Sequence, residues 1–153
     1  MTGSDREREL VDTLEATGFA AMRCPASGGA TDRDLPDVLA GKNGHRPGTP
    51  IRDVPVKCVA IELKSGKSTT LYVQPEEVEA LQSFAERFGA TPLLAARFTS
   101  RASPVRIYGV RPSDARKTDS GNYGLPQSDI EERASVIWTP PVGDREPDVV
   151  WCG

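Results

Sequence analysis

Two segments of the sequence carry carboxylates and a lysine at a spacing suited to phosphodiester hydrolysis. Glu62 and Lys64 are two residues apart in Val56–Lys64, whose apolar residues alternate as in a strand, so both side chains project from one face. Asp37 follows Pro36 in an earlier apolar segment and lies beside them if the two segments pair. Two adjacent carboxylates form the oxygen-rich site that Mg²⁺ prefers, and a neighbouring lysine can orient a metal-activated water and offset charge on a phosphate. The alternative is a surface pair on a solvated sheet face, because Glu-x-Lys alone carries little information.

The residues that follow, SGKST at 65–69, look like the end of a phosphate-binding P-loop. That motif needs its first glycine at position 61, but the residue there is Ile61, in the middle of the alternating segment. No helix begins at Lys67 either, because Thr69–Val73 favours extended chain. We therefore expect a turn that leaves the strand, with Lys67 near phosphate, and no nucleotide cofactor.

The carboxylates need a frame of strands and helices, and the pattern predicts an α/β fold with a mixed central sheet flanked by helices. A helix is expected to start at a capping box formed by Ser4 and Glu7 and to stop at Gly18. The other expected elements are strands at 19–22, 35–40, 56–64, 92–98 and 105–110, a long exposed turn at 41–55, and a helix from Pro75 to Gly89.

Composition indicates one globular domain of 153 residues, with 37% hydrophobic and 27% charged residues. No segment is apolar over the roughly 18 residues that a membrane span needs, and the charged start leads us to expect a cytoplasmic protein without a membrane partner. Three separated cysteines are expected to be reduced thiols.

The net charge of −3 hides an uneven distribution. Residues 118–153 hold seven acidic and two basic residues, which leaves 15 acidic and 17 basic residues in positions 1–117. We expect a nuclease domain at 1–117 and an acidic, proline-containing extension at 118–153. Its stretch TPPVGDREP is expected to be loosely held, with little to bury.

Seven short blocks occur in an order that points to one family. They are RERELV (6–11), GFAAMR (18–23), PASGG (25–29), LPDVLAG (35–41), AIELKSG (60–66), LYV (71–73) and FAERFGATPLLAARF (84–98). Together they resemble the archaeal-type Holliday junction resolvases of the PD-(D/E)XK nuclease superfamily. The resemblance implies a restriction-endonuclease-like core and metal-dependent cleavage of four-way DNA junctions, in which a homodimer cuts two opposed strands symmetrically.

The resemblance also implies residue roles. It places Asp37, Glu62 and Lys64 at the metal and catalytic positions, Glu7 at an additional acidic position, Arg8 and Arg23 at basic positions near DNA, Ser27 on a mobile loop, and Phe84 and Phe88 at a dimer interface. The sequence itself supports Glu7, which shares the apolar stripe of the first helix, although it could instead close the capping box. The two arginines could be solvated, Ser27 could be an ordinary loop residue, and the two phenylalanines could be core residues.

Our hypothesis is a homodimeric endonuclease that uses Mg²⁺, with Mn²⁺ as an alternative ion, to resolve four-way DNA junctions in recombination and repair. Asp37, Glu62 and the Leu63 carbonyl are expected to bind the metal with help from Glu7, and Lys64 to position or deprotonate the water. The residues expected to act in catalysis are Glu7, Ser27, Asp37, Glu62 and Lys64, and those expected to contact DNA are Arg6, Arg8, Arg23, Ser27 and Lys67. The alternatives are another nuclease of this superfamily, of restriction or repair type, a junction-binding protein that does not cut, and a nucleotide-binding enzyme.

Overall fold

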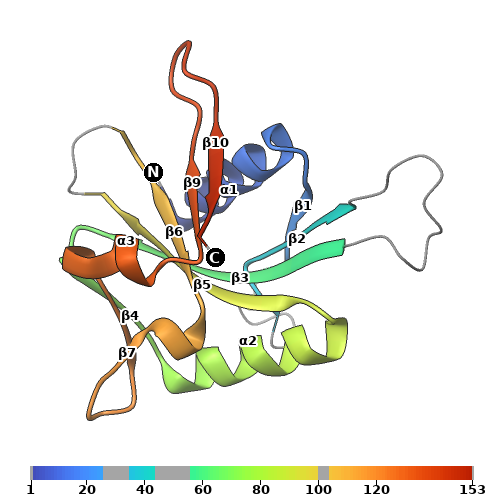
Figure 1. The fold of residues 1–153 in the computed structure, drawn as a ribbon. Helices are drawn as coiled ribbons and strands as arrows, with labels where there is room; N and C mark the ends of the chain where they lie inside the picture. The colour runs from blue at the N-terminus through green and yellow to red at the C-terminus, as the bar shows by residue number, and fades with distance from the viewer. Residues whose placement is uncertain (1, 26–34, 44–55, 100–103, 153) are drawn as a thin grey trace.

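The architecture comes from a computed structural model, which describes residues 2–25, 35–43, 56–99 and 104–152 (Figure 1). Its elements are α1 (Gly3–Ala16), β1 (Ala20–Arg23), β2 (Val38–Asn43), β3 (Val56–Gly66), β4 (Thr70–Val73), α2 (Pro75–Phe88), β5 (Thr91–Phe98), β6 (Ile107–Val110), β7 (Arg116–Lys117), β8 (Tyr123–Pro126), α3 (Ile130–Arg133), β9 (Val136–Thr139) and β10 (Asp148–Trp151). Two 3₁₀ turns, Pro112–Asp114 and Gln127–Asp129, precede β7 and α3.

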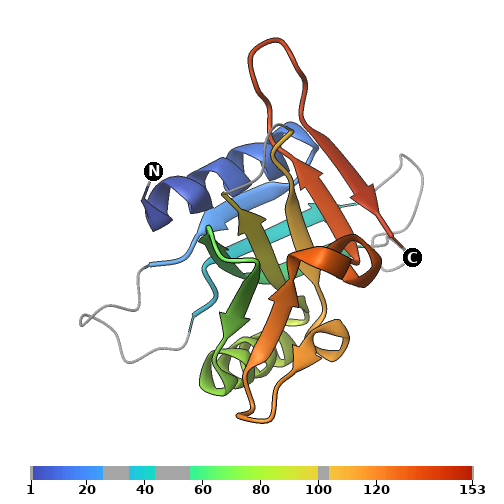
Figure 2. The same cartoon turned by 90° about the vertical axis from the view of Figure 1, so that its left-hand side faces the viewer.

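Seven strands form the main sheet in the order β1-β2-β3-β5-β6-β9-β10. All neighbours are antiparallel except β3 and β5, which are parallel and are connected through β4 and α2. A second sheet of three strands, β4-β8-β7, lies beside the main sheet (Figure 2). The mixed sheet flanked by helices that the sequence predicts is therefore confirmed.

Each face of the main sheet has its own buried core, because β3 is apolar on both sides over most of its length. Val59 and Ile61 pack with α1, whose Leu10 and Leu14 are fully buried. Ala60 faces the other way, into the core that α2, β4 and β8 complete. Helix α1 thus covers one face and α2 the other (Figure 1). Glu62 and Lys64 continue the row of Ala60, so they lie on the face of α2.

Several element boundaries differ from those expected from the sequence. The first helix is capped by Thr2 and Asp5, not by Ser4 and Glu7, so that prediction is wrong. Strand β2 starts three residues later than expected and runs on to Asn43, because its last residues pair with the start of β3. Most of the expected turn at 41–55 lies outside the described residues. Strand β4, which pairs with β8, was expected only as extended chain.

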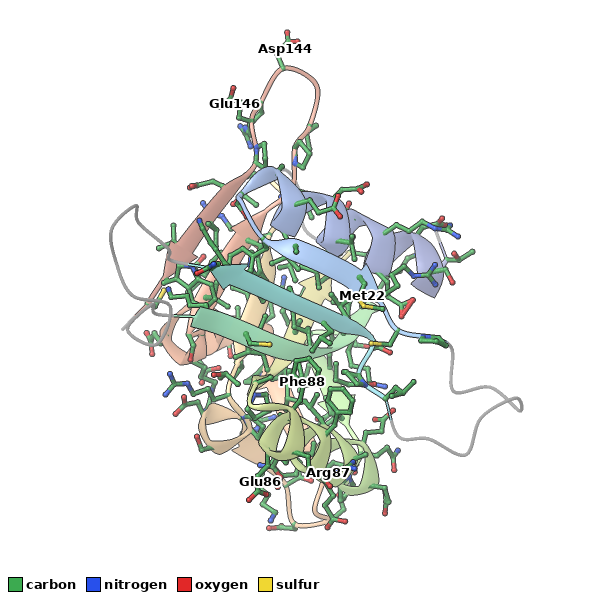
Figure 3. All side chains as sticks on the ribbon, turned by 90° about the vertical axis from the view of Figure 1, so that its right-hand side faces the viewer. Met22, Glu86, Arg87, Phe88, Asp144 and Glu146 are labelled. Carbon is green, nitrogen blue, oxygen red and sulfur yellow. The ribbon has the colours of Figure 1, made fainter. Side chains whose placement is uncertain are left out.

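The stretch TPPVGDREP, which was expected to have little to bury, is mostly exposed, whereas the elements on either side of it contribute to the buried cores. Strand β9 joins the main sheet, and its Val136 and Trp138 are fully buried against the face of α1. Leu125 and Ile130 are equally buried in the other core. Of this segment, the loop between β9 and β10 projects from the body, with Asp144 and Glu146 exposed on it (Figure 3). The negative charge of the segment is therefore carried by surface residues around an apolar framework.

All three cysteines are free thiols, as expected. In the part of the chain that the structure describes, no helix has the length and apolar character to cross a membrane.

Candidate active site

Asp37 is held at the start of β2 by hydrogen bonds to its neighbours on both sides. Its backbone N–H donates to the carbonyl of Ile61 (2.9 Å), and its own carbonyl accepts from the N–H of Cys24 (2.9 Å). Its side-chain oxygen Oδ2 accepts the backbone N–H of Leu63 at 2.8 Å. This last bond fixes the carboxylate against the segment of β3 that carries Glu62 and Lys64.

Glu62 and Lys64 share one face of β3, as the alternation predicts. The Lys64 Nζ is 4.0 Å from Glu62 Oε1 and only 2.8 Å from Oε1 of Glu77, a residue of the first turn of α2. Glu77 was missed in the sequence. The only signal that could have found it is its place in the first turn of the helix that follows β4, which returns to the same face of the sheet.

The surroundings of Asp37 and Glu62 disfavour the ionised forms of both carboxylates. Burial raises the pKa of Glu62 to about 8, and the nearby charge of Asp37 adds to the effect. Burial likewise raises the pKa of Asp37, although the Leu63 N–H opposes the shift by stabilising the ionised form. Two half-buried carboxylates whose ionised forms are both disfavoured by burial form a site that a cation would stabilise.

Glu7 reaches the same site from α1, on the other side of the sheet. Its Oε2 accepts a hydrogen bond from Arg23 Nη2 at 3.3 Å, and its charge contributes to the raised pKa of Asp37. The alternative role for Glu7 in a capping box is excluded, because Thr2 and Asp5 form that box. The structure thus brings Glu7 together with Asp37, Glu62 and Lys64, as the sequence predicts.

These residues line a hollow of about 420 Å³ at the N-terminal end of α1. The hollow is lined by Thr2, Gly3, Ser4, Arg6, Glu7, Asp37, Glu62, Leu63, Lys64 and Ser65. Among the described residues, no three His, Cys, Asp or Glu side chains are already grouped as ligands of a metal ion. The pair Asp37 and Glu62 still fits Mg²⁺, which binds one or two carboxylates and completes its shell with water and phosphate oxygens.

The basic residues expected near DNA lie at different distances from this hollow. Arg6 lines it, and burial together with the charge of Arg97 lowers its guanidinium pKa. Arg23 is paired with Glu7 there, whereas Arg8 is exposed and paired with Asp5. Lys67 is exposed in the bend between β3 and β4. Ser27 lies outside the described residues.

The two phenylalanines expected at a dimer interface lie on α2. Their rings stack with centroids 5.5 Å apart, but only Phe84 packs against the core, since Phe88 is 54% exposed. Met22 on β1 is equally exposed, and both residues are visible on the side of the molecule shown in Figure 3. Phe84 is therefore partly a core residue, and Phe88 presents an apolar ring to solvent.

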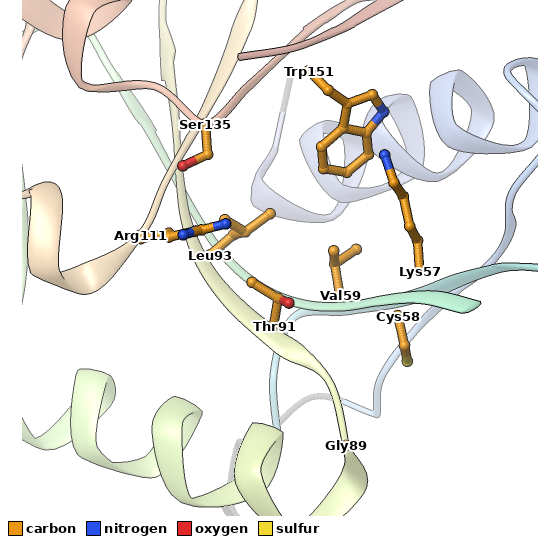
Figure 4. Close-up of a pocket in the computed structure, with 9 residues that line it drawn as sticks. All are labelled: Lys57, Cys58, Val59, Gly89, Thr91, Leu93, Arg111, Ser135 and Trp151. Carbon is orange, nitrogen blue, oxygen red and sulfur yellow. The ribbon is translucent and has the colours of Figure 1, made fainter. Parts of the chain in front are cut away.

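A second cavity, of about 320 Å³, lies at the opposite end of β3 from the carboxylates (Figure 4). Lys57 and Trp151 line it, with the Lys57 Nζ 4.0 Å from the centroid of the indole. Arg111 and Ser135 lie across the cavity from them. None of its lining residues is a carboxylate, so the chemistry described above belongs to the first hollow.

Comparison with known proteins identifies the family. The family model for archaeal Holliday junction resolvase (Hjc) matches residues 1–136. The crossover junction endodeoxyribonuclease Hjc of Sulfolobus acidocaldarius is 34% identical over 122 residues, which are 79% of this chain and 73% of that protein. The Hjc of Sulfurisphaera tokodaii is 30% identical over 131 residues, which are 85% and 79% of the two chains. The solved structure of Archaeoglobus fulgidus Hjc, a Holliday junction resolvase, superposes with a TM-score of 0.66 at 27% identity and covers 84% of this chain and 89% of that one. The chain belongs to the archaeal Holliday junction resolvase family and has its restriction-endonuclease-like fold.

Proposed function

We propose that this protein is a crossover junction endodeoxyribonuclease that resolves four-way DNA junctions with a Mg²⁺ ion bound at Asp37 and Glu62. The observation that carries the proposal is the convergence of these two carboxylates with Lys64 at one end of β3, within a chain of the resolvase family. The raised pKa values of both carboxyls support a bound divalent cation, because a positive charge between them would offset their repulsion.

Each residue of the site would have its own role in this reaction. The Asp37 and Glu62 carboxylates would hold the ion, which would supply Lewis-acid stabilisation of charge on the phosphate. The Leu63 N–H keeps Asp37 in place, and the Leu63 carbonyl offers a further oxygen. Lys64 Nζ orients the attacking water and, as an ammonium, donates to the phosphate oxygens. Glu7, held by Arg23, assists the ion directly or through a water molecule.

Selectivity for a junction would come from the geometry of a homodimer and from phosphate contacts instead of base recognition. Phe88 supports the homodimer, because its exposed ring offers apolar surface that a second copy could bury beside Phe84. Arg6 and Arg23 line or adjoin the site and would contact the phosphates nearest the cut, and the exposed Arg8 and Lys67 would contact other phosphates.

The test is Mg²⁺-dependent cleavage of a synthetic four-way junction, mapped on all four strands, with Mn²⁺ as a second ion. The proposal expects paired, symmetric cuts on two opposed strands and little cleavage of linear duplex or flap DNA of the same sequence. Equal cleavage of all three substrates would instead identify a nuclease of restriction or repair type. Tight junction binding without cuts in either ion would identify a binding protein.

A further inference from the structure

The ion pair between Lys64 and Glu77 has no place in the scheme above, although it is the shortest contact that Lys64 makes. The Lys64 Nζ lies 2.8 Å from Glu77 Oε1, against 4.0 Å from Glu62 Oε1. The other Glu77 oxygen, Oε2, accepts the backbone N–H of Gln74 at 3.0 Å. The carboxylate is thus fixed at two points, by the lysine on one side and by the start of α2 on the other.

The position of Glu77 is set by rigid parts of the fold. Pro75 fixes the backbone at the first position of α2, and the capping bond to Gln74 orients the Glu77 side chain. Lysine, by contrast, has four rotatable bonds and a strongly hydrated ammonium group, so it does not hold one position unaided. The ion pair with Glu77, which is fixed at the start of α2, therefore restrains the position of the Lys64 ammonium group.

Stability alone does not explain a carboxylate in this place. The Lys64 and Glu77 side chains are 31% and 34% exposed, and an ion pair at such exposure contributes little to folding. At the same time Glu77 adds to the repulsion that raises the pKa of both Asp37 and Glu62. Glu77 caps the start of α2 through Gln74, but an uncharged glutamine could fill that role, so the cap does not require the negative charge that Glu77 places beside Asp37 and Glu62.

We infer that Glu77 is a positioning residue that holds Lys64 Nζ away from Glu62, so that the Glu62 carboxylate stays available to a metal ion while the lysine stays beside the reacting phosphate. Without Glu77, the nearest carboxylate to Lys64 is Glu62, and a direct ion pair there would compete with metal binding for the same oxygens. Glu77 acts through the lysine and does not itself bind the ion or the DNA. The inference rests on the proposed nuclease function.

A double-mutant cycle on the full-length chain tests this role. The four proteins are wild type, Glu77→Gln, Lys64→Ala and the double variant, and Glu79→Gln, an exposed glutamate of the same helix, is the control. Glutamine retains an oxygen that can cap Gln74, so the helix start is preserved. Two quantities are measured for each: the affinity for Mn²⁺ by calorimetry, and the single-turnover rate of junction cleavage at saturating Mg²⁺.

We expect Glu77→Gln to weaken Mn²⁺ binding severalfold and to slow cleavage by about 10- to 100-fold, the usual consequence of a displaced catalytic group. In the Lys64→Ala background the same substitution should change either quantity by no more than about twofold, because the residue through which it acts is gone. Junction binding by Glu77→Gln should match that of wild type, because Glu77 does not contact the DNA in this scheme.

Two results would overturn the inference. One is wild-type behaviour of Glu77→Gln. The other is an equal loss in both backgrounds, which would mean that Glu77 acts on the ion or the DNA directly. Cleavage by the wild-type protein is the reference for all four, so a failure of the proposed function would appear there first, while the Mn²⁺ affinities would still decide the role of Glu77.

Discussion

Replacement of Glu62 by Gln should make the metal-free protein more stable at alkaline pH while it removes the nuclease activity. The side chain is 15% exposed, and burial raises its pKa from 4.5 to about 8 in the folded chain. Because the folded-state pKa lies above that of the unfolded chain, folding is favoured by the protonated form. That contribution is fully present below pH 4.5 and is lost as the pH rises through about 8.

The size of the effect follows from the shift. One pKa unit corresponds to 1.36 kcal/mol, so a rise of the pKa from 4.5 to about 8 sets a ceiling of about 5 kcal/mol. Coupling to Asp37 and local relaxation reduce this value, and we expect about 2–4 kcal/mol between pH 4.5 and pH 8. That is a large part of the roughly 5–15 kcal/mol that stabilises a typical domain. Glutamine keeps the shape of the side chain and carries no charge, so the variant should escape the loss.

The assay is urea denaturation at a series of pH values in a chelator, monitored by the fluorescence of the buried Trp138. The stability difference between Glu62→Gln and wild type should be near zero at pH 4.5 and should grow to about 2–4 kcal/mol at pH 8. Added Mg²⁺ should stabilise wild type at pH 8 and leave the variant unaffected. The exposed Glu79→Gln should follow wild type at every pH. A variant that is less stable than wild type at pH 8 would refute this account of the site, since Glu62 would then be stabilised as a carboxylate by the protein alone.

Three further outcomes are expected. Asp37→Asn keeps an oxygen for the Leu63 N–H, so it should fold normally and bind junctions within a few-fold of wild type, yet cleave about 100-fold more slowly or worse in single-turnover assays; rapid cleavage by this variant would exclude Asp37 as a metal ligand. Phe88→Asp should shift a dimer toward monomer in sedimentation without a loss of unfolding free energy. Phe84→Ala should also destabilise the fold, because its ring packs on the core. An unchanged sedimentation coefficient for the Phe88 variant would place the dimer contact elsewhere. Trp138→Ala should cost about 3–5 kcal/mol of unfolding free energy, because the indole is fully buried in the core beneath α1; a cost under about 1 kcal/mol would show that the packing of this indole contributes little to stability.

Much of the frame could be predicted because local rules and tertiary packing agree there. Alternating residues in β3, together with Pro75 and Gly89 at the ends of α2, predict those elements closely. No strand or helix was predicted in the C-terminal segment, for the opposite reason. Its buried residues are spread over the short elements β8, α3 and β9, and each alone has too few apolar residues to stand out among acidic and turn-forming neighbours. Only their packing in the folded chain shows that Leu125, Ile130 and Trp138 lie inside.

Two glutamates show where sequence reasoning about the site reaches its limit. Glu7 follows Ser4 at the spacing of a capping box, so a local pattern offered a mistaken account of a residue that lines the same hollow as Asp37 and Glu62. Glu77 does close a capping box, with Gln74, and the same carboxylate also holds Lys64. The spacing of a capping box thus does not prove that a residue caps the helix, and a residue that does cap it can have a second role. The spacing determines only which backbone N–H the side chain can reach. Whether a carboxylate at the start of a helix also contacts the site depends on where the fold places that helix. In this chain α1 and α2 both begin beside the carboxylates of Asp37 and Glu62.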